Sequence, residues 1–462
     1  MRESPMALDR SNHLLIPVET LEREFDGKLL LALLAAERGW KPIVGGRTAM
    51  HRHLTSLPRS VYVSKGIRSG SRLIFSLLEK MGHAIVGFDE EALVRFSDEV
   101  FLMKLERETL SRVRLFFAWG HDNAQIWRRS PAYDGQPVLE VGNPRADMMR
   151  PELRRYYEAD VASIRQRFGD FVLINSNFSA VNHFIANHSR FKVADWAPSD
   201  KTNYYKSGMQ AHKRALFEAF LGMLPALSQA MAPYNVVVRP HPSENRETWR
   251  IAAAGLDNVH VVHEGPVVPW LVAARALVHN GCTSAVEAAV VGTPTFAYRP
   301  TLSDQFDITL PNELSRQCFD AQSLFAELRR TMQRPRPASR ELSPSQDALL
   351  RNVIASIDGK LSCERILDAL DEHRALLGPA PWAGPVSWLK AWARLQRRAL
   401  GRAVRTRIKS NPSSRVYTAH KFPGIDLTEV NRRIDLFQLA TGRFAEFQAR
   451  QIARDIFAIQ PR

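Results

Sequence analysis

The sequence predicts an α/β protein with two facing, doubly wound domains, followed by a helical and basic C-terminal region. Short apolar segments alternate with helical segments of about ten residues, which is the pattern of βαβ units on a parallel sheet. This pattern restarts near residue 170, and 462 residues are enough for two or three domains. The predicted domain ranges are 1–150, 151–335 and 336–462.

The first range supplies one set of βαβ units. Its predicted helices are Leu29–Arg38 and Arg72–Met81, and Glu152–Phe168 forms an amphipathic linker helix to the next range. The predicted strands are His13–Val18, Lys41–Val44, Ser60–Val63, His83–Phe88, Arg114–Ala118 and Val138–Val141.

The second range repeats the pattern. Ligands of such domains bind at the carboxyl ends of the strands, and Asn182–Gln210 is a predicted loop near that edge. The predicted helices are Lys213–Ala230, Val268–Ala274 and Ser284–Val291. The predicted strands are Phe171–Asn175, Tyr234–Arg239, Val259–His263, Ala276–His279 and Thr295–Tyr298.

The composition is that of a globular protein without a disulfide framework. Hydrophobic residues make up 45% of the chain and charged residues 24%. The three cysteines, Cys282, Cys318 and Cys363, are widely spaced and match neither a disulfide pattern nor a zinc site. No apolar run approaches the roughly 20 residues that span a bilayer, and there is no secretory signal pattern. We therefore expect a cytoplasmic protein.

The turn that follows the strand Ala276–His279 carries the strongest functional signal. It contains Gly281, Thr283 and Ser284 and leads directly into a helix. Free backbone N–H groups and the positive end of the helix dipole favour an anion there. Ser284 and Glu287 have the spacing of a capping box, so Glu287 either closes that box or binds ribose hydroxyls.

A second strand carries Arg239, His241 and Pro242 to the same edge of the predicted sheet. A planar guanidinium binds phosphate through two hydrogen bonds, and an imidazole N–H donates one more. A His-Pro dipeptide alone is typical of a turn. Combined with the Gly281–Ser284 turn, it predicts a phosphate or nucleotide site, toward which Asn175 and Asn177 present amide groups.

In the first range, Asp89, Glu90 and Glu91 directly follow an apolar strand. One of these carboxylates is a candidate general base for an acceptor hydroxyl. The alternative is that they cap a helix that begins near Glu91. Weaker candidates at the same edge are Lys65, Gly66 and His121, and for His121 a structural role is favoured.

The segments Arg239-Pro-His-Pro, His279-Asn-Gly-Cys-Thr-Ser-x-x-Glu287 and Gly292-Thr-Pro294 resemble the nucleotide half of GT-B glycosyltransferases. Residues 10–300 resemble bacterial surface-carbohydrate biosynthesis proteins, a group that includes capsule transferases, sialyltransferases and teichoic-acid glycerophosphotransferases. The resemblance implies two Rossmann-like domains. It also implies that His241, Pro242, Thr283 and Ser284 hold the donor phosphate and that Glu287 holds the ribose. Ala92 stands where the sialyltransferase-like pattern has glycine after its acidic pair.

Much of the net charge of +15 lies in residues 373–425, which contain eleven basic residues and no acidic one. This block predicts contact with an anionic surface, and a solvated helix face is the alternative. Among anionic partners, nucleic acid is disfavoured because no reading motif is present. Trp382, Trp388 and Trp392 suit a membrane interface. The basic residues are Arg374, Lys390, Arg394, Arg397, Arg398, Arg402, Arg405, Arg407, Lys409, Arg415 and Lys421.

Together these features predict a metal-independent glycosyltransferase of surface polysaccharide biosynthesis, peripheral on the inner membrane. Its substrates would be a nucleotide-sugar donor and a glycan or lipid-linked acceptor. We expect no cofactor, because the chain has no Asp-x-Asp motif in a metal-binding context and no His/Cys cluster. The alternatives are a nucleotide-sugar 2-epimerase and a non-catalytic scaffold of the same fold.

Overall fold

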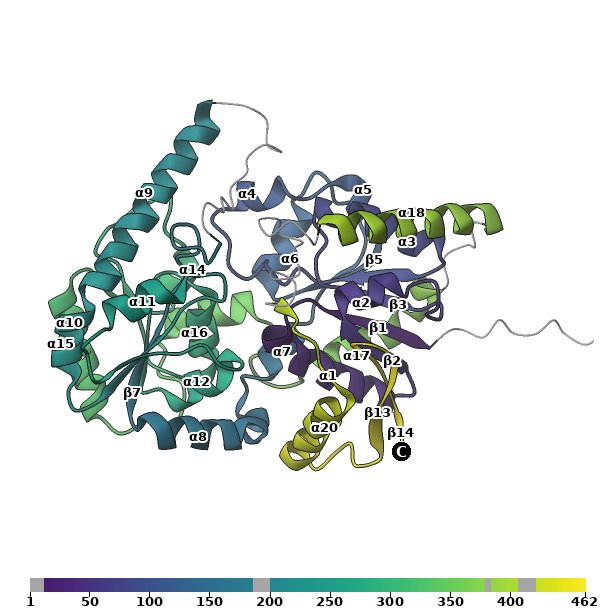
Figure 1. Ribbon diagram of the computed structural model, residues 1–462. Helices are drawn as coiled ribbons and strands as arrows, with labels where there is room; N and C mark the ends of the chain where they lie inside the picture. Colours follow the sequence, from purple (N-terminus) through teal and green to yellow (C-terminus); the bar gives the residue numbers. More distant parts are fainter. Residues whose placement is uncertain (1–11, 186–199, 379–383, 406–420) are drawn as a thin grey trace, which may run out of the picture. The chain divides into compact units, whose positions relative to one another are not determined.

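The computed structural model describes residues 12–185, 200–378, 384–405 and 421–462 (Figure 1). The chain forms two compact units, each built on its own sheet. Residues 352–462 belong to the same unit as the N-terminal residues, so they are not a separate third region. Unit 1 comprises Met1–Leu93, Ser97–Met148 and Asn352–Arg462, and unit 2 comprises Val94–Phe96 and Met149–Arg351.

Unit 1 contains an eight-stranded sheet in the order β13-β14-β2-β1-β3-β4-β5-β6. The strands β1 to β6 run parallel, and their residues are largely buried, as expected where helices cover both faces. The strand order reverses between β1 and β3, and ligands bind at such a point. The strands are β1 (His13–Val18), β2 (Lys41–Gly46), β3 (Val61–Ser64), β4 (Ala84–Gly87), β5 (Val113–Ala118), β6 (Val138–Glu140), β13 (Phe447–Ala453) and β14 (Ile456–Pro461).

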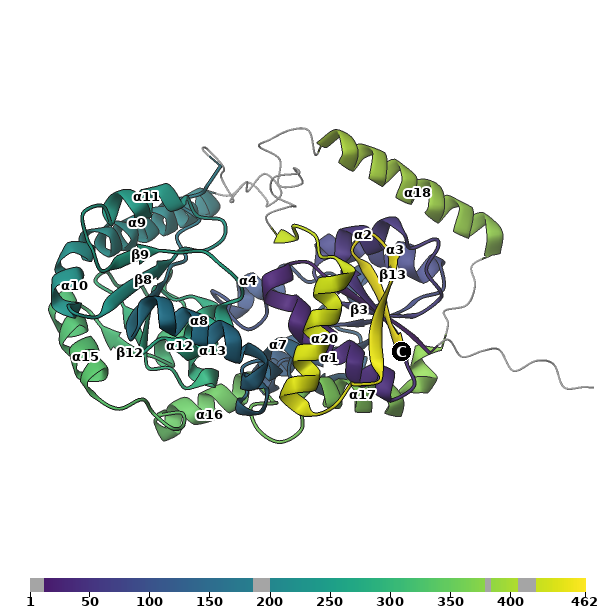
Figure 2. The same cartoon turned by 60° about the horizontal axis from the view of Figure 1, so that its bottom comes forward.

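Helix α1 (Leu21–Glu37) is buried around most of its circumference, because neighbouring helices cover the sides that the sheet leaves open. Figure 2 shows α20 (Leu427–Thr441) beside α1. The other helices of unit 1 are α2 (Arg47–Arg52), α3 (Arg72–Lys80), α4 (Asp98–Leu102), α5 (Arg107–Leu110), α6 (His121–Arg128), α7 (Pro144–Asp147), α17 (Ser362–Glu372) and α18 (Gly384–Arg405).

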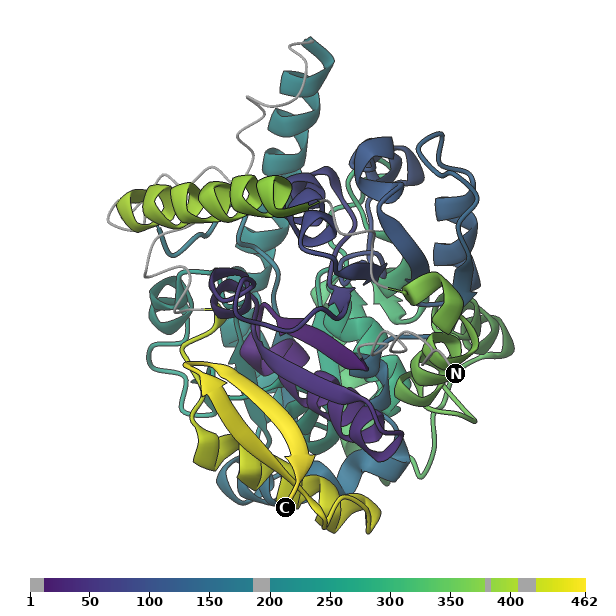
Figure 3. The ribbon, with the colours of Figure 1, turned by 90° about the vertical axis from the view of Figure 1, so that its right-hand side faces the viewer.

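The prediction that the C-terminal region is helical is incomplete, because β13 and β14 form a hairpin at its end. β14 pairs antiparallel with β2 and so extends the parallel sheet by two strands (Figure 3). Ile456 and Phe457 are fully buried. Without β14, β2 would be an edge strand with exposed backbone N–H and C=O groups, and β14 pairs with these groups. Three of the basic residues named above, Arg407, Lys409 and Arg415, lie outside the described residues, and so does Trp382.

Unit 2 contains a six-stranded, fully parallel sheet in the order β12-β11-β10-β7-β8-β9. The strand order reverses between β7 and β10. Sequence reasoning missed β12, a strand of three residues of which two are exposed. The strands are β7 (Phe171–Asn175), β8 (Asn235–Arg239), β9 (Val259–Val261), β10 (Ala276–His279), β11 (Thr295–Tyr298) and β12 (Arg316–Cys318).

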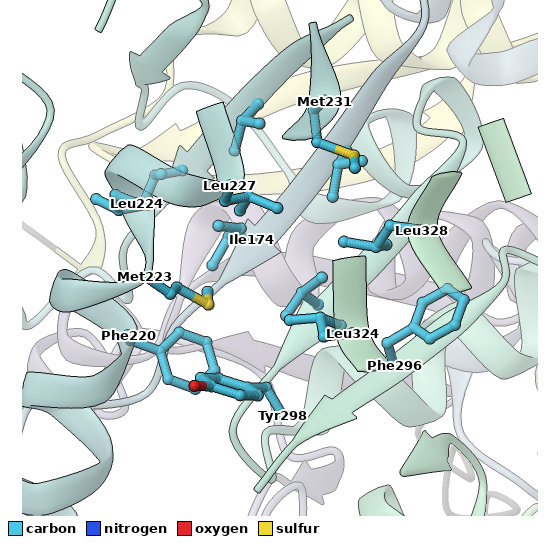
Figure 4. Packing of buried hydrophobic residues seen from close by; sticks show 14 of the residues in the cluster. Ile174, Phe220, Met223, Leu224, Leu227, Met231, Phe296, Tyr298, Leu324 and Leu328 are labelled. Atoms are coloured by element: carbon cyan, nitrogen blue, oxygen red, sulfur yellow. The ribbon is translucent and has the colours of Figure 1, made fainter. Parts of the chain in front are cut away.

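The core of unit 2 lies between this sheet and the helices α10 and α15. Leu324 and Leu328 of α15 are one turn apart and fully buried, and they pack in one cluster with Ile174 of β7 (Figure 4). Residues 200–210 belong to helix α9 and not to the predicted loop. The helices are α8 (Glu158–Phe168), α9 (Asp200–Gly222), α10 (Leu224–Met231), α11 (Arg246–Ala252), α12 (Val267–Ala273), α13 (Thr283–Val291), α14 (Thr309–Glu313), α15 (Ala321–Gln333) and α16 (Pro344–Val353).

Candidate functional site

The polar residues predicted around the Gly281 turn lie at the point where the strand order of unit 2 reverses. Asn175 ends β7 and is in register with His279, which ends β10. Asn177 donates its backbone N–H to Asn280 Oδ1 over 2.9 Å, which ties the two strand ends together. In open parallel sheets this position is where ligands bind.

The turn itself is fixed by a buried histidine. His279 Nδ1 accepts the backbone N–H of Gly281 over 2.9 Å, so the ring proton lies on Nε2, which is 2.8 Å from Ser315 Oγ. Burial lowers the pKa of His279 to about 3, so the ring is neutral at physiological pH. Gly281 has a φ of +78°, which a residue with a side chain adopts only under strain.

Helix α13 begins at Thr283, and Cys282 is its N-cap residue. The predicted capping box is therefore wrong, because Ser284 is the second helical residue and Glu287 the fifth. The side chain of Cys282 makes no capping hydrogen bond to the helix, and its Sγ lies 2.6 Å from Ser284 Oγ. The first N–H groups of a helix have no partner inside the helix, and together with the dipole they attract an anion.

The amide of Asn175 adds an unused polar group to the same place. Asn175 is 6% exposed, and its Oδ1 has no hydrogen-bond partner among the described residues. The backbone carbonyl of Asn175 lies 3.8 Å from Cys282 Sγ, at the start of α13. A buried acceptor without a partner is unfavourable unless a ligand or water donates to it.

The loop after β8 is organised by Glu244, a residue that sequence reasoning did not select. Its buried carboxylate accepts hydrogen bonds from Ser176 Oγ (2.8 Å), from the backbone N–H of Phe178 (2.9 Å) and of His241 (3.2 Å), and from Trp249 Nε1 (3.0 Å). Burial raises the pKa of Glu244, while these donors oppose the rise. Glu244 thus joins the end of β7 to the His-Pro loop.

His241 is oriented by its own loop. Its Nδ1 accepts the backbone N–H of Ser243 over 3.1 Å, so the proton of the neutral ring lies on Nε2. An Nε2–H group is a donor, as binding to a phosphate oxygen requires. Pro242 is exposed next to it in the same loop.

The structure does not bring Arg239 to the Gly281 turn. Its guanidinium donates to the carbonyl of Glu264 over 3.0 Å and to that of Gly265, and it lies 5.8 Å from the centre of the Trp270 ring. These groups follow β9, on the side of β8 that faces away from β10. The sequence could place Arg239 at a strand end but could not determine the direction of its side chain.

In unit 1 the three predicted carboxylates follow β4, but two of them are buried in ion pairs. Asp89 pairs with Arg68 Nε at 2.6 Å, and its side chain is 2% exposed. Glu90, also 2% exposed, lies 3.5 Å from Lys28 Nζ. No helix begins near residue 91 in this described segment, so the predicted capping role of these acids is wrong.

Glu91 differs from its two neighbours. Its side chain is 51% exposed and pairs with Arg23 at 2.7 Å. Arg23 lowers the pKa of Glu91 to about 2, so the carboxylate is ionised across the physiological range. Ala92, which stands where the resembling pattern has glycine, is buried.

Lys65 belongs to a network of charges around the ends of β1 and β3. It pairs with Glu19, which also lies 2.7 Å from Lys421 and 3.3 Å from Arg47. Burial opposes ionisation of Glu19, but these three cations lower its pKa well below the usual range. The C-terminal segment thus takes part in this edge of the unit 1 sheet through Lys421.

The other two weaker candidates, His121 and Gly66, lie in different surroundings. His121 is exposed on the first turn of α6, 3.1 Å from Glu140 Oε1. At the neighbouring Gly120, a Cβ atom would lie 2.6 Å from the carbonyl carbon of Val353, so the protein's own backbone fills the space beside this glycine. Gly66 has open space around its Cα.

Other chemistry-bearing groups of unit 2 were missed because their helices carry no local motif. These are Lys213 on α9 and Asn312 on α14, both buried. No cluster of three or more His, Cys, Asp or Glu side chains suited to a metal ion occurs in the described part of the chain. Over that same part, no helix is both long and apolar enough to cross a membrane.

No protein-family profile and no curated protein sequence matches the chain. Among solved structures, the wall teichoic acid polymerase TagF matches with a TM-score of 0.51 and 11% identity, over 80% of this chain and 90% of that one. UDP-GlcNAc 2-epimerase from Neisseria meningitidis, bound to UDP-GlcNAc, gives a TM-score of 0.49 and 11% identity, over 78% and 99%. At such identities the likeness to the polymerase shows the fold alone. The chain has a GT-B-type fold, with two doubly wound α/β units, as the sequence predicted.

Proposed function

We propose that this chain is a glycosyltransferase-like enzyme of surface polysaccharide biosynthesis that takes a nucleotide-activated sugar as donor. The observation that carries the proposal is the site in unit 2. There, the uncapped N-terminus of α13, the turn at Gly281 and the buried Asn175 amide meet where the strand order reverses. That arrangement supplies N–H donors for a diphosphate and an acceptor for a neighbouring hydroxyl or amino group.

The chemistry requires that the charge that develops on the leaving phosphate be stabilised. The N–H groups of Thr283 and Ser284 and the Nε2–H of His241 are donors of the right kind, held in place before the reaction. We propose that they do this without a metal ion. Glu287, one turn into α13 and buried, is the proposed ribose contact.

For the general base we propose Glu91. All three carboxylates after β4 pair with a cation, but the side chain of Glu91 is 51% exposed, whereas those of Asp89 and Glu90 are 2% exposed. A base must come within hydrogen-bond distance of the acceptor hydroxyl, and exposure permits this. Its low pKa keeps it ionised but makes it a weak base, so we expect a Glu91→Gln variant to lose catalytic rate without losing donor affinity.

We further propose that α18 places the enzyme on an anionic bilayer. Ala391 and Leu395 of α18 are buried, and the helix contacts α3. Other positions of the helix expose apolar side chains, with Val386 64%, Leu389 57% and Trp392 39% exposed. Lys390, Arg394 and Arg397 are exposed as well. Each basic residue near such a surface contributes about 1 kcal/mol, and exposed apolar groups add to it.

A pair of variants at one position tests the donor site. Thr283→Pro removes the first N–H of α13, yet proline is favourable at the first helical position and Cys282 before it is extended. Thr283→Ala is the control, because it removes the hydroxyl and keeps the N–H. Thermal-shift titrations with UDP-, CDP-, GDP- and CMP-linked sugars should identify one donor class, stabilising wild type by about 2.7 kcal/mol at 100 times its dissociation constant.

We expect Thr283→Pro to weaken that donor about tenfold or more, the value of a lost hydrogen bond to a charged group, and Thr283→Ala to weaken it less. No shift with any nucleotide sugar would refute the donor site. With the donor known, release of its nucleotide should depend on added glycan acceptor. Formation of an epimerised nucleotide sugar without acceptor would instead establish an epimerase.

Membrane docking is tested by co-sedimentation with vesicles. Wild type should sediment with phosphatidylglycerol vesicles and stay in solution with phosphatidylcholine vesicles, and added salt should release it. Leu389→Glu should abolish sedimentation. Leu439→Glu is the matched control, because Leu439 is 53% exposed on α20. Equal binding to both vesicle types, or equal effects of the two variants, would refute the role of α18.

A further inference from the structure

The second half of α9 packs against the loop that precedes α14. A Cβ atom at Gly208 would lie 2.8 Å from the ring of Phe306, so the helix and the loop are in close contact. One turn later, His212 Nε2 is 2.9 Å from Asp307 Oδ1. The other carboxylate oxygen of Asp307 accepts a hydrogen bond from Arg299 over 2.6 Å.

The end of this loop and the helix α14 that follows it lie beside the Gly281 turn. Measured from where a Cβ atom at Gly281 would stand, Ile308 Cβ is at 3.7 Å and Asn312 Oδ1 at 3.9 Å. Asn312 is 5% exposed, and its Oδ1 has no hydrogen-bond partner among the described residues. A second buried acceptor therefore lies beside the turn, in addition to Asn175 Oδ1.

Lys213 follows His212 on α9 and is 6% exposed. It interacts electrostatically with Asp307 and with Cys282, the N-cap residue of α13. Among the described residues Lys213 forms no ion pair within 4 Å and no hydrogen bond, and both oxygens of Asp307 are engaged by His212 and Arg299. Burial disfavours the charged form of Lys213 and lowers its pKa, so an anion bound close to its ammonium group would stabilise that charge.

We propose that Lys213 is the cation that binds the phosphates of the nucleotide donor, in place of Arg239, and that Asn175 and Asn312 accept hydrogen bonds from the same ligand. This inference rests on the proposed function and specifies its site further. The anion would lie between Lys213 and the N-terminus of α13. The two amide oxygens require N–H or O–H donors on the rest of the ligand, such as the hydroxyls of a sugar or the amino group of a base.

The test compares Lys213→Met with Lys213→Arg and with Arg214→Met. Arg214 is the exposed neighbour on the same helix, so its variant changes the net charge equally without altering the buried site. The probes are UDP, CDP, uridine, cytidine and inorganic pyrophosphate, titrated calorimetrically at two salt concentrations. We expect Lys213→Met to weaken the diphosphates and pyrophosphate about tenfold or more, and to leave any nucleoside affinity unchanged.

Lys213→Arg should retain most of the affinity, and Arg214→Met should bind as wild type does. The diphosphate affinity of Lys213→Met should also depend less on salt than that of wild type. Without ligand, Lys213→Met should melt at the same temperature as wild type or higher, because the change removes an unpaired buried charge. A lower melting temperature, or equal losses for nucleoside and diphosphate, would make Lys213 structural and overturn the inference.

Unchanged diphosphate binding in Lys213→Met would overturn it too. If wild type binds pyrophosphate but no nucleotide, the nucleotide donor of the proposed function fails, and the comparison of variants on pyrophosphate still decides the role of Lys213. If wild type binds neither, both proposals fail.

Discussion

Replacing Glu244 by glutamine should loosen the loops that form the site in unit 2. One carboxylate oxygen of Glu244 accepts from Ser176, Phe178 and His241, and the other accepts from Trp249 Nε1. Glutamine has a single acceptor oxygen and an amino group that only donates. If its oxygen keeps the first three bonds, its NH2 group faces the indole N–H, and two donors meet in a buried place.

The expected loss of free energy of unfolding follows from the number of hydrogen bonds that the substitution breaks or weakens. One buried donor, Trp249 Nε1, loses its partner, which costs about 1–3 kcal/mol. The three remaining bonds also weaken, since their acceptor no longer carries a charge. We therefore expect Glu244→Gln to lower the free energy of unfolding of unit 2 by about 2–3 kcal/mol. Because His241 loses part of its support, the affinity for the nucleotide donor should fall as well.

Urea unfolding, followed by circular dichroism and tryptophan fluorescence, measures the change. Glu247→Gln is the matched control, because Glu247 has a 62% exposed side chain and pairs with Arg250 at 3.4 Å. Exposed pairs of this kind contribute about 0–1 kcal/mol. If Glu244→Gln unfolds within about 0.5 kcal/mol of wild type, or no more easily than the control, the assignment of Glu244 as the anchor of both loops is refuted.

Three further predictions concern single positions. Gly281→Ala should cost about 1–2 kcal/mol, because a side chain is strained at φ +78°, and should weaken donor binding in the same calorimetric titration; unchanged values for both would contradict the role of the turn. His279 has a pKa near 3 in the folded protein and about 6.5 in the unfolded chain, so between these values only the unfolded chain binds the proton. The free energy of unfolding should therefore fall as the pH drops below 6.5, by about 2 kcal/mol at pH 5. Urea unfolding at pH 5 and 7 should show a smaller loss in His279→Asn, and an equal loss would refute this linkage. Gly120→Ala should cost about 1–3 kcal/mol, because its Cβ would meet backbone of Val353, while the control Gly66→Ala has open space and should be neutral in thermal unfolding.

The sequence predicted the central strands well because parallel strands covered on both faces are continuous apolar runs that end at turn residues. Four strands, among them Phe171–Asn175 and Ala276–His279, have the predicted bounds. The hairpin β13–β14 has no such signature. Arg450 and Gln451 interrupt its apolar residues, because one face of the hairpin is exposed.

Domain boundaries were harder to predict because the contacts that decide them are distant in sequence. Asp147 accepts the backbone N–H groups of Ser362 (2.7 Å) and Cys363 (2.9 Å) at the start of α17, across more than 200 residues. Burial raises the pKa of Asp147 to about 6. Nothing in the local sequence around Asp147 shows that a helix from the C-terminal region will settle on it.

Within the site, local features were predictable and side-chain directions were not. The turn at Gly281 and the start of α13 follow from neighbouring residues, although the N-cap is Cys282 and not Ser284. The direction of Arg239 depends on the carbonyl groups that follow β9, and the burial of Lys213 depends on where α9 packs. Both are tertiary properties that a motif does not encode.

The charges at the two sheet edges explain why we assign the donor phosphates to unit 2. In unit 1 the buried carboxylates already hold cations of the chain, as Glu19 does with Lys65 and Glu90 with Lys28. An added anion would compete with these carboxylates for their cations, and breaking a buried pair is costly. In unit 2 the cation Lys213 and the uncapped helix α13 have no anionic group of the chain in ion-pair contact within the described residues. An incoming diphosphate would therefore gain interactions there without breaking an ion pair between described residues.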